Sequence, residues 1–325
     1  MRILVTGSSG HLGDALVRVL GGEGHDVVGL DILPSPSTSV VGSVADAACV
    51  RRCIGGVDAV VATATLHKPH VSSHSRQEFV DTNVTGTLTL LEEAVAAGVS
   101  RFVLTSTTSA FGRALTPPPG APAAWITEDV VPVPRNVYGV TKTAAEDLCE
   151  LVHRDHGLPC VILRTSRFFP EGDDREEIRS LYTDANVKLN ELLYRRVDLE
   201  DVVGAHRLAL ERAPALGFGR FIVSATTPFS TGDLAELAAD APAVVRRRFP
   251  DYGAVYEERG WTMFPRIERV YVNERARREL GWSPRYDFRF ALDRLAAGEE
   301  PRSELSREIG AKGYHAVTAG PYTTR

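Results

Sequence analysis

Apolar positions along the first half of the chain follow two alternating patterns. Short runs rich in β-branched residues, which are typical of strands, are separated by longer segments in which apolar residues recur at helical spacing. Because the short runs are apolar on both faces, the alternation predicts a parallel sheet that is covered by helices on both sides. Strands are predicted at residues 3–7, 25–31, 39–44, 57–65, 101–107 and 160–166. Helices are predicted between them at residues 11–22, 46–54, 76–98 and 138–157.

The second half of the chain is less regular. A helix is predicted over residues 200–212, and a strand follows at residues 217–225. Another helix is expected to begin after Ser230 and Thr231, whose hydroxyls suit a helix N-terminus. We expect a smaller lobe here, with some elements that cross back to the main sheet. The remaining predictions are helices at residues 273–282 and 287–299 and a proline-rich surface loop at residues 116–122.

Composition narrows the class of protein. The 325 residues are 43% hydrophobic and 24% charged, and 37 basic against 42 acidic residues give a net charge of -5, so we expect no nucleic-acid partner. Four cysteines are too few for a disulfide framework, and Cys49 and Cys53 have no neighbouring ligand that would make a metal site. The chain opens directly into a strand, and no apolar run is long enough to span a bilayer. We therefore expect a cytosolic protein that does not bind membranes.

Three glycines after the first strand are spaced as GxxGxxG. Gly7 permits a tight turn, Gly10 lets a phosphate approach the backbone, and Gly13 lets helix and strand pack closely. The motif lies between a predicted strand and a predicted helix, where the helix N-terminus favours the pyrophosphate of a dinucleotide. The predicted fold class is therefore α/β, with a Rossmann-type doubly wound parallel sheet. A dinucleotide-binding domain is expected over residues 1–166, and a smaller C-terminal α/β lobe, mainly for substrate, over residues 167–325.

The end of the second predicted strand indicates which dinucleotide binds. Asp31 stands there, and its carboxylate would accept hydrogen bonds from the adenosine ribose and repel a 2′-phosphate. Ile32 and Leu33 follow, so no basic residue is ready to hold that phosphate. The expected cofactor is NAD rather than NADP.

A tyrosine and a lysine open the helix predicted at residues 138–157. Tyr138 and Lys142 are four residues apart, so their side chains share one helix face. A nearby ammonium stabilises phenolate, and we therefore expect Lys142 to lower the pKa of Tyr138. A phenol with a lowered pKa would exchange a proton near neutral pH. The hydroxyl-rich end of the strand at residues 101–107 precedes this pair and offers further polar groups.

Taken together, these features resemble the extended short-chain dehydrogenase/reductase superfamily, of the NAD-dependent epimerase/dehydratase type. The resemblance covers nearly the whole chain, and the combination is specific for the superfamily but much less so for the substrate. The residues that carry it are TGSSGHLG (6–13), Asp31, Asn83, LTSTTSAFG (104–112), Tyr138, Lys142, LEDVVGAH (199–206) and YVNERARRELGWSPRYDF (271–288).

The resemblance implies roles for individual residues. Tyr138 would exchange the hydroxyl proton, Lys142 would tune Tyr138 and hold the nicotinamide ribose, and Thr107 would hydrogen-bond to the reacting oxygen. Ser106 is the alternative to Thr107 if the alignment slips by one residue. Contacts with NAD are expected at Gly7, Gly10, His11, Leu12, Gly13, Asp31, Ile32, Ser43, Val44, Thr63, Ala64, Thr65, Asn83, Thr105, Tyr138, Lys142 and Thr165.

The residues after Thr107 bear on the reaction. Sugar dehydratases of this superfamily place Asp-Glu there, and nucleotide-sugar decarboxylases place Glu at the second position. This chain has Thr108 and Ser109, which do not titrate usefully, so dehydration and decarboxylation are disfavoured. The leading interpretation is an NAD-dependent epimerase of a sugar or sugar derivative that acts through a transient ketone. The alternatives are a dehydrogenase or reductase of a small polyol, sugar acid or ketone, and an NAD(H)-sensing module, which the intact Tyr138–Lys142 pair disfavours.

The chain departs from the family pattern at positions that would contact the adenine of the cofactor and the substrate. Ser43-Val44 replaces a common Asp-aliphatic pair, and Arg167 stands where an asparagine is usual. The stretch from Arg167 to Asp201 is short for enclosing a nucleoside diphosphate, which slightly favours a smaller substrate. His67 could face the site but is interpreted as a loop residue. The candidate substrate residues are Thr108, Ser109, Arg167 and Arg266.

Two long helices suggest how the chain assembles. The helices near residues 75–97 and 138–156 carry more apolar residues than one sheet face requires. The family commonly pairs these helices across a two-fold axis, so we expect a homodimer.

Overall fold

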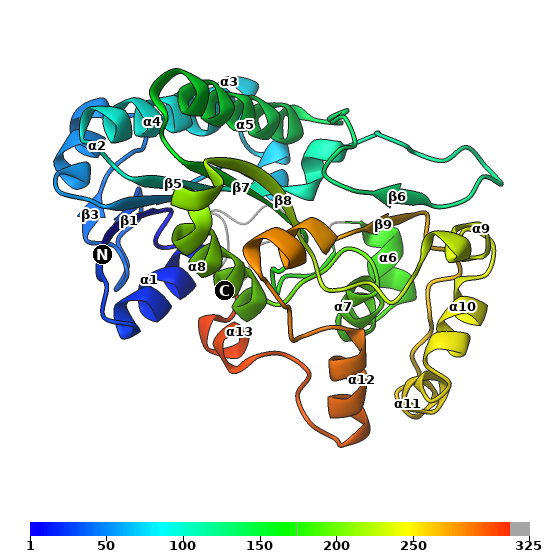
Figure 1. Ribbon diagram of the computed structural model, residues 1–325. Helices are drawn as coiled ribbons and strands as arrows, with labels where there is room; N and C mark the ends of the chain where they lie inside the picture. The colour runs from blue at the N-terminus through cyan, green and yellow to red at the C-terminus, as the bar shows by residue number, and fades with distance from the viewer. Residues whose placement is uncertain (174, 313–325) are drawn as a thin grey trace.

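A seven-stranded parallel sheet forms the centre of the molecule in the computed structural model, which describes residues 1–173 and 175–312. The strand order is β3-β2-β1-β4-β5-β7-β8, and the sheet runs through the upper half of the view in Figure 1. This order reverses direction at β1, which is the topological switch point of a Rossmann-type fold. The strands are β1 (Arg2–Thr6), β2 (Asp26–Asp31), β3 (Val40–Val41), β4 (Ala59–Ala62), β5 (Arg101–Thr107), β7 (Cys160–Thr165) and β8 (Phe218–Val223).

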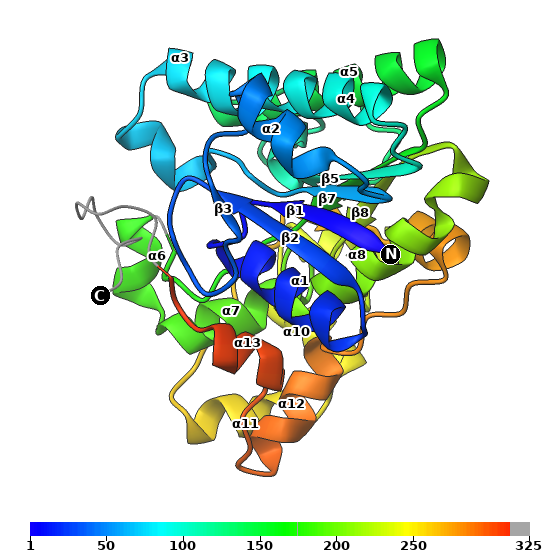
Figure 2. The same ribbon diagram turned by 90° about the vertical axis from the view of Figure 1, so that its left-hand side faces the viewer.

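Helices cover both faces of this sheet, and the alternation of side chains along the strands shows why. In β1, Ile3 and Val5 belong to one core cluster and Leu4 to another, because successive residues of a strand point to opposite faces. Helices α1 (His11–Gly22) and α8 (Leu199–Leu216) supply the first cluster. Helices α2 (Ala47–Ile54), α4 (Gly86–Ala96) and α5 (Val137–His156) supply the second, as the layers in Figure 2 show.

The predicted fold class is confirmed. Each strand expected in the first half is present, although β3 is reduced to two residues. The helix expected at residues 76–98 is not regular throughout, because α3 (Arg76–Phe79) leads into a π-helical segment, η2 (Val80–Thr85), before α4 begins. Short 3-10 turns occur at η1 (Lys68–Ser72), η3 (Thr108–Phe111) and η4 (Thr231–Asp233).

A smaller lobe has its own core and its own sheet. Strand β6 (Ala124–Ile126) pairs in parallel with β9 (Arg269–Tyr271), so a segment from the first half of the chain belongs to this lobe. Strand β8 and helix α8 return to the main sheet. The other elements that follow β7 are α6 (Glu176–Leu181), α7 (Asp184–Leu192), α9 (Leu234–Leu237), α10 (Ala241–Arg248), α11 (Tyr252–Glu258), η5 (Ala276–Leu280), α12 (Phe288–Ala296) and α13 (Glu304–Ile309).

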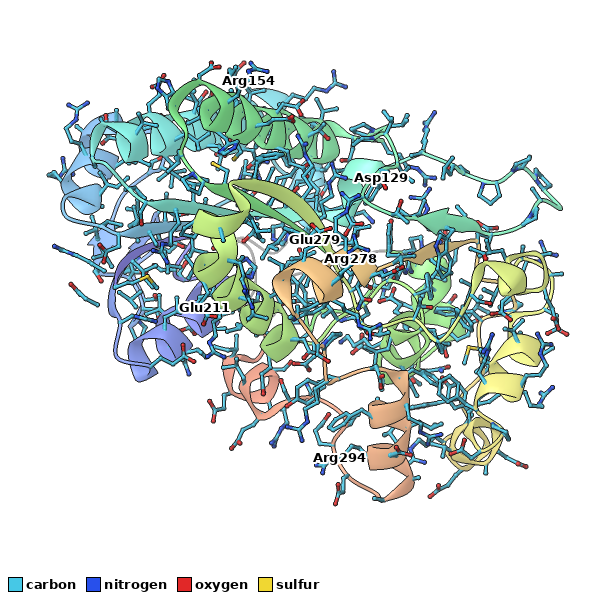
Figure 3. The ribbon with its side chains drawn as sticks, in the orientation of Figure 1. Asp129, Arg154, Glu211, Arg278, Glu279 and Arg294 are labelled. Atoms are coloured by element: carbon cyan, nitrogen blue, oxygen red, sulfur yellow. The ribbon has the colours of Figure 1, made fainter. Side chains whose placement is uncertain are left out.

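Charged side chains of both signs lie on the outside of the molecule. Figure 3 labels Arg154 on α5, Glu211 on α8 and Arg294 on α12, and neighbouring Arg278 and Glu279 carry opposite charges. Among the described residues, no helix combines the length and the hydropathy that a bilayer span requires.

Candidate functional site

The glycine turn between β1 and α1 has the geometry that a bound pyrophosphate needs. Gly7 has a φ of 69°, and a Cβ there would lie 2.8 Å from the backbone nitrogen of Ala64. A Cβ on Gly13 would lie 2.0 Å from the carbonyl oxygen of Gly7, so only glycine allows this close packing of helix on strand. Gly10 is the N-cap of the twelve-residue helix α1 and leaves the helix N-terminus open to an anion.

Asp31 lies at the end of β2, beside this turn. Its carboxylate oxygens accept hydrogen bonds from the backbone N–H groups of Ser9 (3.0 Å) and Leu33 (2.9 Å). These bonds fix the carboxylate while leaving it partly exposed, which suits the ribose hydroxyls of a dinucleotide. Ile32 is 68% exposed and offers an apolar surface for an adenine ring. These residues fit NAD.

The loops after β3 and β4 border the same edge of the sheet. Thr63 Oγ1 donates to the carbonyl of Thr6 (2.5 Å), and Ala64 N donates to Thr6 Oγ1 (3.2 Å), so the loop after β4 is held against the end of β1. Val44 is buried against Gly86, where a Cβ would meet it at 2.6 Å. Ser43, adjacent to it, accepts a hydrogen bond from the backbone of Ala45, and Thr65 donates to Asn83 Oδ1 (2.9 Å).

Several other predicted NAD contacts have side chains that are already engaged within the fold. Thr105 Oγ1 lies 2.7 Å from His206 Nε2, and Thr165 Oγ1 donates to the carbonyl of Ser106 (2.9 Å). Leu12 packs in the core, and His11 is buried with its Nε2 2.8 Å from Glu171 Oε1. Contacts of these residues with NAD would therefore involve backbone or apolar atoms rather than free polar side chains.

The three predicted catalytic residues are brought together at the end of β5 and the start of α5. Thr107 ends β5 and accepts a hydrogen bond from the backbone of Ser109 (3.1 Å), and its hydroxyl also hydrogen-bonds to the phenol of Tyr138. Lys142 follows one turn later on the same helix. All three side chains are buried, with Tyr138 8% exposed and Lys142 2% exposed. A buried phenol, hydroxyl and amine in one cluster are suited to proton exchange.

The expected lowering of the tyrosine pKa is wrong for the protein alone. Burial raises the pKa of Tyr138 to about 12, and the hydrogen bond from Thr107 only partly offsets this. Burial also lowers the pKa of Lys142 to about 8, against the effect of the Glu146 carboxylate, which raises it. Desolvation disfavours the charged form of each group, and it outweighs the effect of Thr107 on Tyr138 and of Glu146 on Lys142.

The alternation of side chains along β5 favours Thr107 over Ser106 as the hydroxyl beside Tyr138. Ser106 points to the opposite face, where its hydroxyl donates to Glu146 Oε1 (2.5 Å). Glu146 is fully buried and also accepts three hydrogen bonds from Arg164, the shortest 2.7 Å. Glu146 and Arg164 were not predicted, although the spacing of Glu146 four residues after Lys142 on one helix face was a usable signal.

The candidate substrate residues lie in different surroundings from one another. Thr108 and Ser109 follow Thr107 directly, in the turn η3. The role of Arg167 in holding an anionic substrate stays a prediction, and its guanidinium is paired with Asp173 and with Glu191 (2.8 Å). These two buried carboxylates stabilise its charge, although Glu191 is shared with Arg195 and Arg196. Arg266 lies on the exposed surface of the lobe.

His67 lies closer to the Tyr138 cluster than its interpretation as a loop residue implied. It was interpreted as a loop residue, yet its side chain is buried and its ring contacts that of Tyr138. The contact depends on how the loop after β4 folds back toward α5, which no local sequence pattern encodes.

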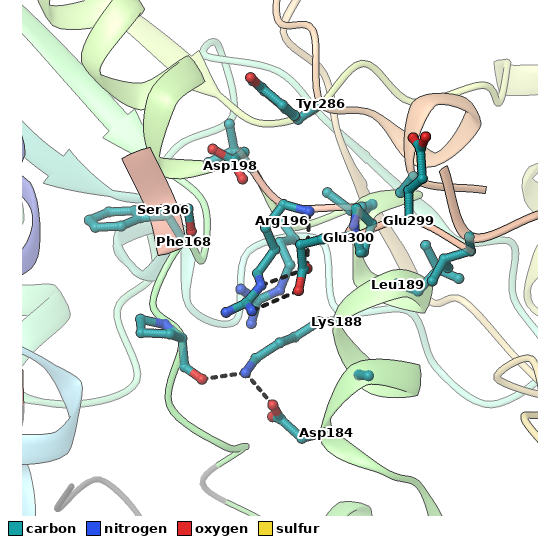
Figure 4. Close-up of a pocket in the computed structure, with 18 of the residues that line it drawn as sticks. Phe168, Asp184, Lys188, Leu189, Arg196, Asp198, Tyr286, Glu299, Glu300 and Ser306 are labelled. Carbon is teal, nitrogen blue, oxygen red and sulfur yellow. Dashed lines mark hydrogen bonds and ion pairs between the residues drawn. The ribbon is translucent and has the colours of Figure 1, made fainter. Parts of the chain in front are cut away.

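A pocket of about 760 Å³ lies in the lobe, as Figure 4 shows. Its four basic side chains are each paired with a carboxylate: Lys188 with Asp184, Arg196 with Glu191 (3.1 Å), Arg259 with Glu258 (3.0 Å) and Arg302 with Glu300 (2.9 Å). Phe169 lines this pocket and also packs against His67, with ring centroids 5.0 Å apart. One aromatic side chain is therefore shared by the pocket and the catalytic cluster.

A parallel sheet with a pyrophosphate turn, a ribose carboxylate and a Thr-Tyr-Lys cluster defines a dinucleotide-dependent enzyme of the short-chain dehydrogenase/reductase type. Residues 3–220 match the model of the NAD dependent epimerase/dehydratase family, and the chain belongs to that family. Its cofactor is NAD.

Individual relatives agree with this assignment. The chain is 32% identical over 184 residues to the low-salt glycan biosynthesis protein Agl12 of Haloferax volcanii, covering 52% of this chain and 57% of that one. It is 25% identical over 322 residues to a UDP-glucose 4-epimerase of Corynebacterium glutamicum, covering 88% and 92% of the two chains. The chain spans about half the length of several curated relatives that it matches.

Solved structures show the same fold. A short-chain dehydrogenase/reductase superfamily protein from Agrobacterium tumefaciens, crystallised with bound NAD, superposes with a TM-score of 0.64 and 27% identity, covering 91% of this chain and 96% of that one.

Proposed function

We propose that this protein is an NAD-dependent epimerase that acts on a sugar or sugar derivative through a transient ketone. The observation that carries the proposal is the buried cluster of Thr107, Tyr138 and Lys142, followed by Thr108 and Ser109. An epimerase needs the first three residues and no further acid or base, whereas dehydration needs side chains that titrate at the following two positions. Relatives named UDP-glucose 4-epimerase support the same reaction class.

The proposed mechanism assigns a separate task to each side chain. Bound NAD supplies the hydride acceptor, and Gly7, Gly10 and Asp31 would hold its pyrophosphate and ribose. Tyr138 takes the proton from the substrate hydroxyl and returns it to the ketone oxygen, while Thr107 hydrogen-bonds to that oxygen. Lys142, one turn from Tyr138, favours the phenolate with its positive charge and would also hold the nicotinamide ribose.

Burial sets a condition on this proton exchange. Because burial raises the pKa of Tyr138 to about 12, the phenolate needs support from Lys142 in its charged form. Burial lowers the pKa of Lys142 to about 8, so this support weakens as the pH rises through that value. The activity should therefore decline above about pH 8.

A dehydrogenase or reductase of a small polyol, sugar acid or ketone is the second candidate. Among the described residues, the segment between Arg167 and Asp201 holds the short helices α6 and α7 and the first residues of α8, which leaves little chain to enclose a nucleotide. The pocket in the lobe adds little positive charge for a diphosphate, because Lys188 and Arg302 are already paired. Both observations slightly favour a small substrate. Arg266, exposed on the lobe, would hold a diphosphate if the substrate is a nucleotide sugar.

We also propose a homodimer formed through α4 and α5. Helix α5 exposes Val140 (55%) and Leu151 (39%), and Val80 in the segment before α4 is 38% exposed. Apolar side chains on two neighbouring helices favour a four-helix bundle across a two-fold axis. Light scattering at micromolar concentration should give twice the mass of one chain, and a monomer mass would contradict the proposal. The cytosolic location stays a prediction.

The function is tested with a panel of free sugars, sugar acids, UDP-glucose and the corresponding ketones, incubated with the NAD-bound enzyme. We expect an epimeric product by NMR without net NADH formation, and Tyr138→Phe should reduce turnover by about 100-fold or more while NAD still binds. Net NADH formation from a polyol would instead establish the dehydrogenase. Substantial turnover in Tyr138→Phe would show that the catalytic cluster is misassigned.

A further inference from the structure

The pocket of about 760 Å³ in the lobe is separate from the proposed catalytic cluster (Figure 4). None of the described residues that line it belongs to the Thr107, Tyr138 and Lys142 cluster or to the predicted contacts with NAD. Its walls come mainly from the segment after β7, from α7, and from the chain that contains α12 and α13. A volume of this size lies in the range of sites that hold a small organic molecule.

Aromatic side chains from three separate parts of the chain line the pocket. Phe168 and Phe169 follow β7. Trp261 follows α11, and Tyr286 precedes α12. Leu189 on α7 adds aliphatic surface. Aromatic walls favour a ligand that itself carries a ring, because offset-stacked and edge-to-face contacts add attraction beyond the burial of apolar area.

The pocket offers no net charge to a ligand. Among the described residues that line it, four basic and four acidic side chains cancel. Each basic side chain is paired with a carboxylate, as described above. Glu299 is paired with Arg294, and Asp198 accepts a hydrogen bond from Ser303, whereas the other two acidic side chains pair with basic ones of the same wall. An ionic ligand would have to compete with these pairs, whereas an uncharged ligand would leave them intact.

Phe169 connects the wall of the pocket to the cofactor turn. Its ring packs against that of His11, at the start of α1, with centroids 5.4 Å apart. It also packs against the ring of His67, with centroids 5.0 Å apart. Phe169 is only partly buried, so a molecule in the pocket would supply packing partners for its remaining surface. Such a molecule would hold Phe169 against His11 and thereby favour the arrangement of the cofactor turn.

We propose that this pocket is a second ligand site, for an uncharged aromatic molecule, and that its occupancy strengthens the binding of NAD through Phe169. Coupling between two sites is reciprocal, so NAD strengthens the binding of the molecule by the same factor. The proposed site involves the cofactor and does not depend on the sugar reaction proposed above.

The site is tested with N-phenyl-1-naphthylamine, an uncharged probe whose fluorescence rises in apolar surroundings. Its anionic counterpart, 8-anilinonaphthalene-1-sulfonate, has the same rings and a sulfonate group. Wild type should bind the uncharged probe about tenfold or more tightly than the anionic one, because the wall has no spare positive charge. Ala291→Phe fills the pocket from α12 and should weaken binding of the uncharged probe by about tenfold or more. If that variant fails to fold, Ala185→Trp, at an exposed lining position on α7, supplies the measurement.

A matched control and a second titration complete the test. Ala296→Phe makes the same chemical change at an exposed position of α12 that does not line the pocket, and it should bind the probe as wild type does. Calorimetry with saturating probe should show NAD binding tightened by about threefold or more, and Phe169→Leu should remove this gain while both ligands still bind. Equal affinity for the two probes, or undiminished binding in Ala291→Phe, would overturn the site. An NAD affinity that the bound probe leaves unchanged in wild type would overturn the coupling.

Discussion

Two buried glutamates are each paired with several arginines. One glutamate lies on α5, the helix that carries Tyr138 and Lys142, and the other lies in the lobe. Glu146 on α5 is paired with Arg164 (2.7 Å) and Arg220 (3.3 Å). Glu191 on α7 is paired with three arginines, namely Arg167 (2.8 Å), Arg195 (2.7 Å) and Arg196 (3.1 Å). Both glutamates are 0% exposed, so each is a buried charge that depends on its partners.

The difference lies in what each glutamate has beside it. Glu146 is one turn from Lys142 and raises its pKa, against burial. Burial would raise the pKa of Glu191, but its arginines more than offset this and hold that pKa well below its ordinary range. Two of the arginines paired with Glu191 are Arg167 and Arg196, whose backbones form an isolated β-bridge. The ion pairs therefore join these two segments of the chain. The same ionic chemistry therefore shifts the pKa of a lysine in the proposed catalytic cluster in one place and joins two segments of chain in the other.

Removing the charge of the lobe cluster should have the largest effect on stability. Glu191→Gln leaves buried arginine charge uncompensated, and we expect the free energy of unfolding to fall by about 3–5 kcal/mol. NAD affinity at temperatures where the variant remains folded should be unchanged. Urea denaturation and calorimetry measure the two quantities. Glu177→Gln, at an exposed position on α6, is the matched control, and a comparable loss there would contradict the assignment.

Glu146→Gln should lower stability by about 3 kcal/mol and also change catalysis. Without the carboxylate, the pKa of Lys142 should fall below about 8, so the alkaline limb of the pH–rate profile should move to lower pH. The profile of kcat/KM measures this shift. Glu150→Gln, at a surface ion pair two turns from Lys142 on α5, should leave the limb in place. If the alkaline limb does not move in Glu146→Gln, Glu146 does not tune Lys142, and the two clusters differ only in position.

Asp31 is a third carboxylate, and it differs from both glutamates because backbone N–H groups rather than arginines hold it. Its charge is thus left for a ligand. Asp31→Ser should weaken NAD binding about tenfold, or about 1.4 kcal/mol, and remove the preference over NADP. Calorimetric titration with both dinucleotides measures this. Asp26→Ser, at the other end of β2, should leave both affinities unchanged, and an undiminished NAD preference in Asp31→Ser would refute the assignment.

The smallest effect is expected at the partly exposed ion pair of Lys312 with Asp14, where Arg18 and Ser37 also contact the carboxylate. Lys312→Met should lower stability by about 1 kcal/mol or less. Burial raises the pKa of Asp14, but these partners lower it below the ordinary 3.8, so the stabilisation is present above that pH and is lost as the pH falls further. The denaturation midpoints of wild type and Lys312→Met should differ by a constant amount between pH 5 and 8. The two midpoints should converge in acid. A difference that persists in acid would argue against the ion pair.

The sequence predicted the features that depend on local pattern. The strands, the glycine turn and the Tyr138–Lys142 spacing are written in consecutive residues, and the structure has the corresponding elements. The alternation along β5 was also available, and it separates Thr107 from Ser106 once the strand is known. The same reasoning could not show which hydroxyls the fold would use, as with Thr105 and His206, which are a hundred residues apart.

What the sequence did not predict depends on distant partners or on burial. Arg167 was predicted as an anion site, but its pairing with Glu191, on a separate helix, had no local signal. The tyrosine pKa was expected to fall because spacing reveals the nearby lysine, whereas the desolvation that raises it requires the packed structure. His67 lies at the site because a loop folds back toward α5, and that contact has no local signature.

The π-helical segment Val80–Thr85 has a consequence for how the chain tolerates changes in length. A π-helix accommodates one residue more than the same stretch of α-helix, so deleting one residue there would restore a regular α-helix. The flanking helices α3 and α4 would keep their orientation, whereas residues inside the segment would move around the helix axis. Asn83 lies inside the segment and would turn away from Leu66 and Thr141, which it now connects. A deletion that leaves both flanking helices in register should therefore still uncouple the loop after β4 from α5, because the extra residue of the π-helix is what places Asn83 between them.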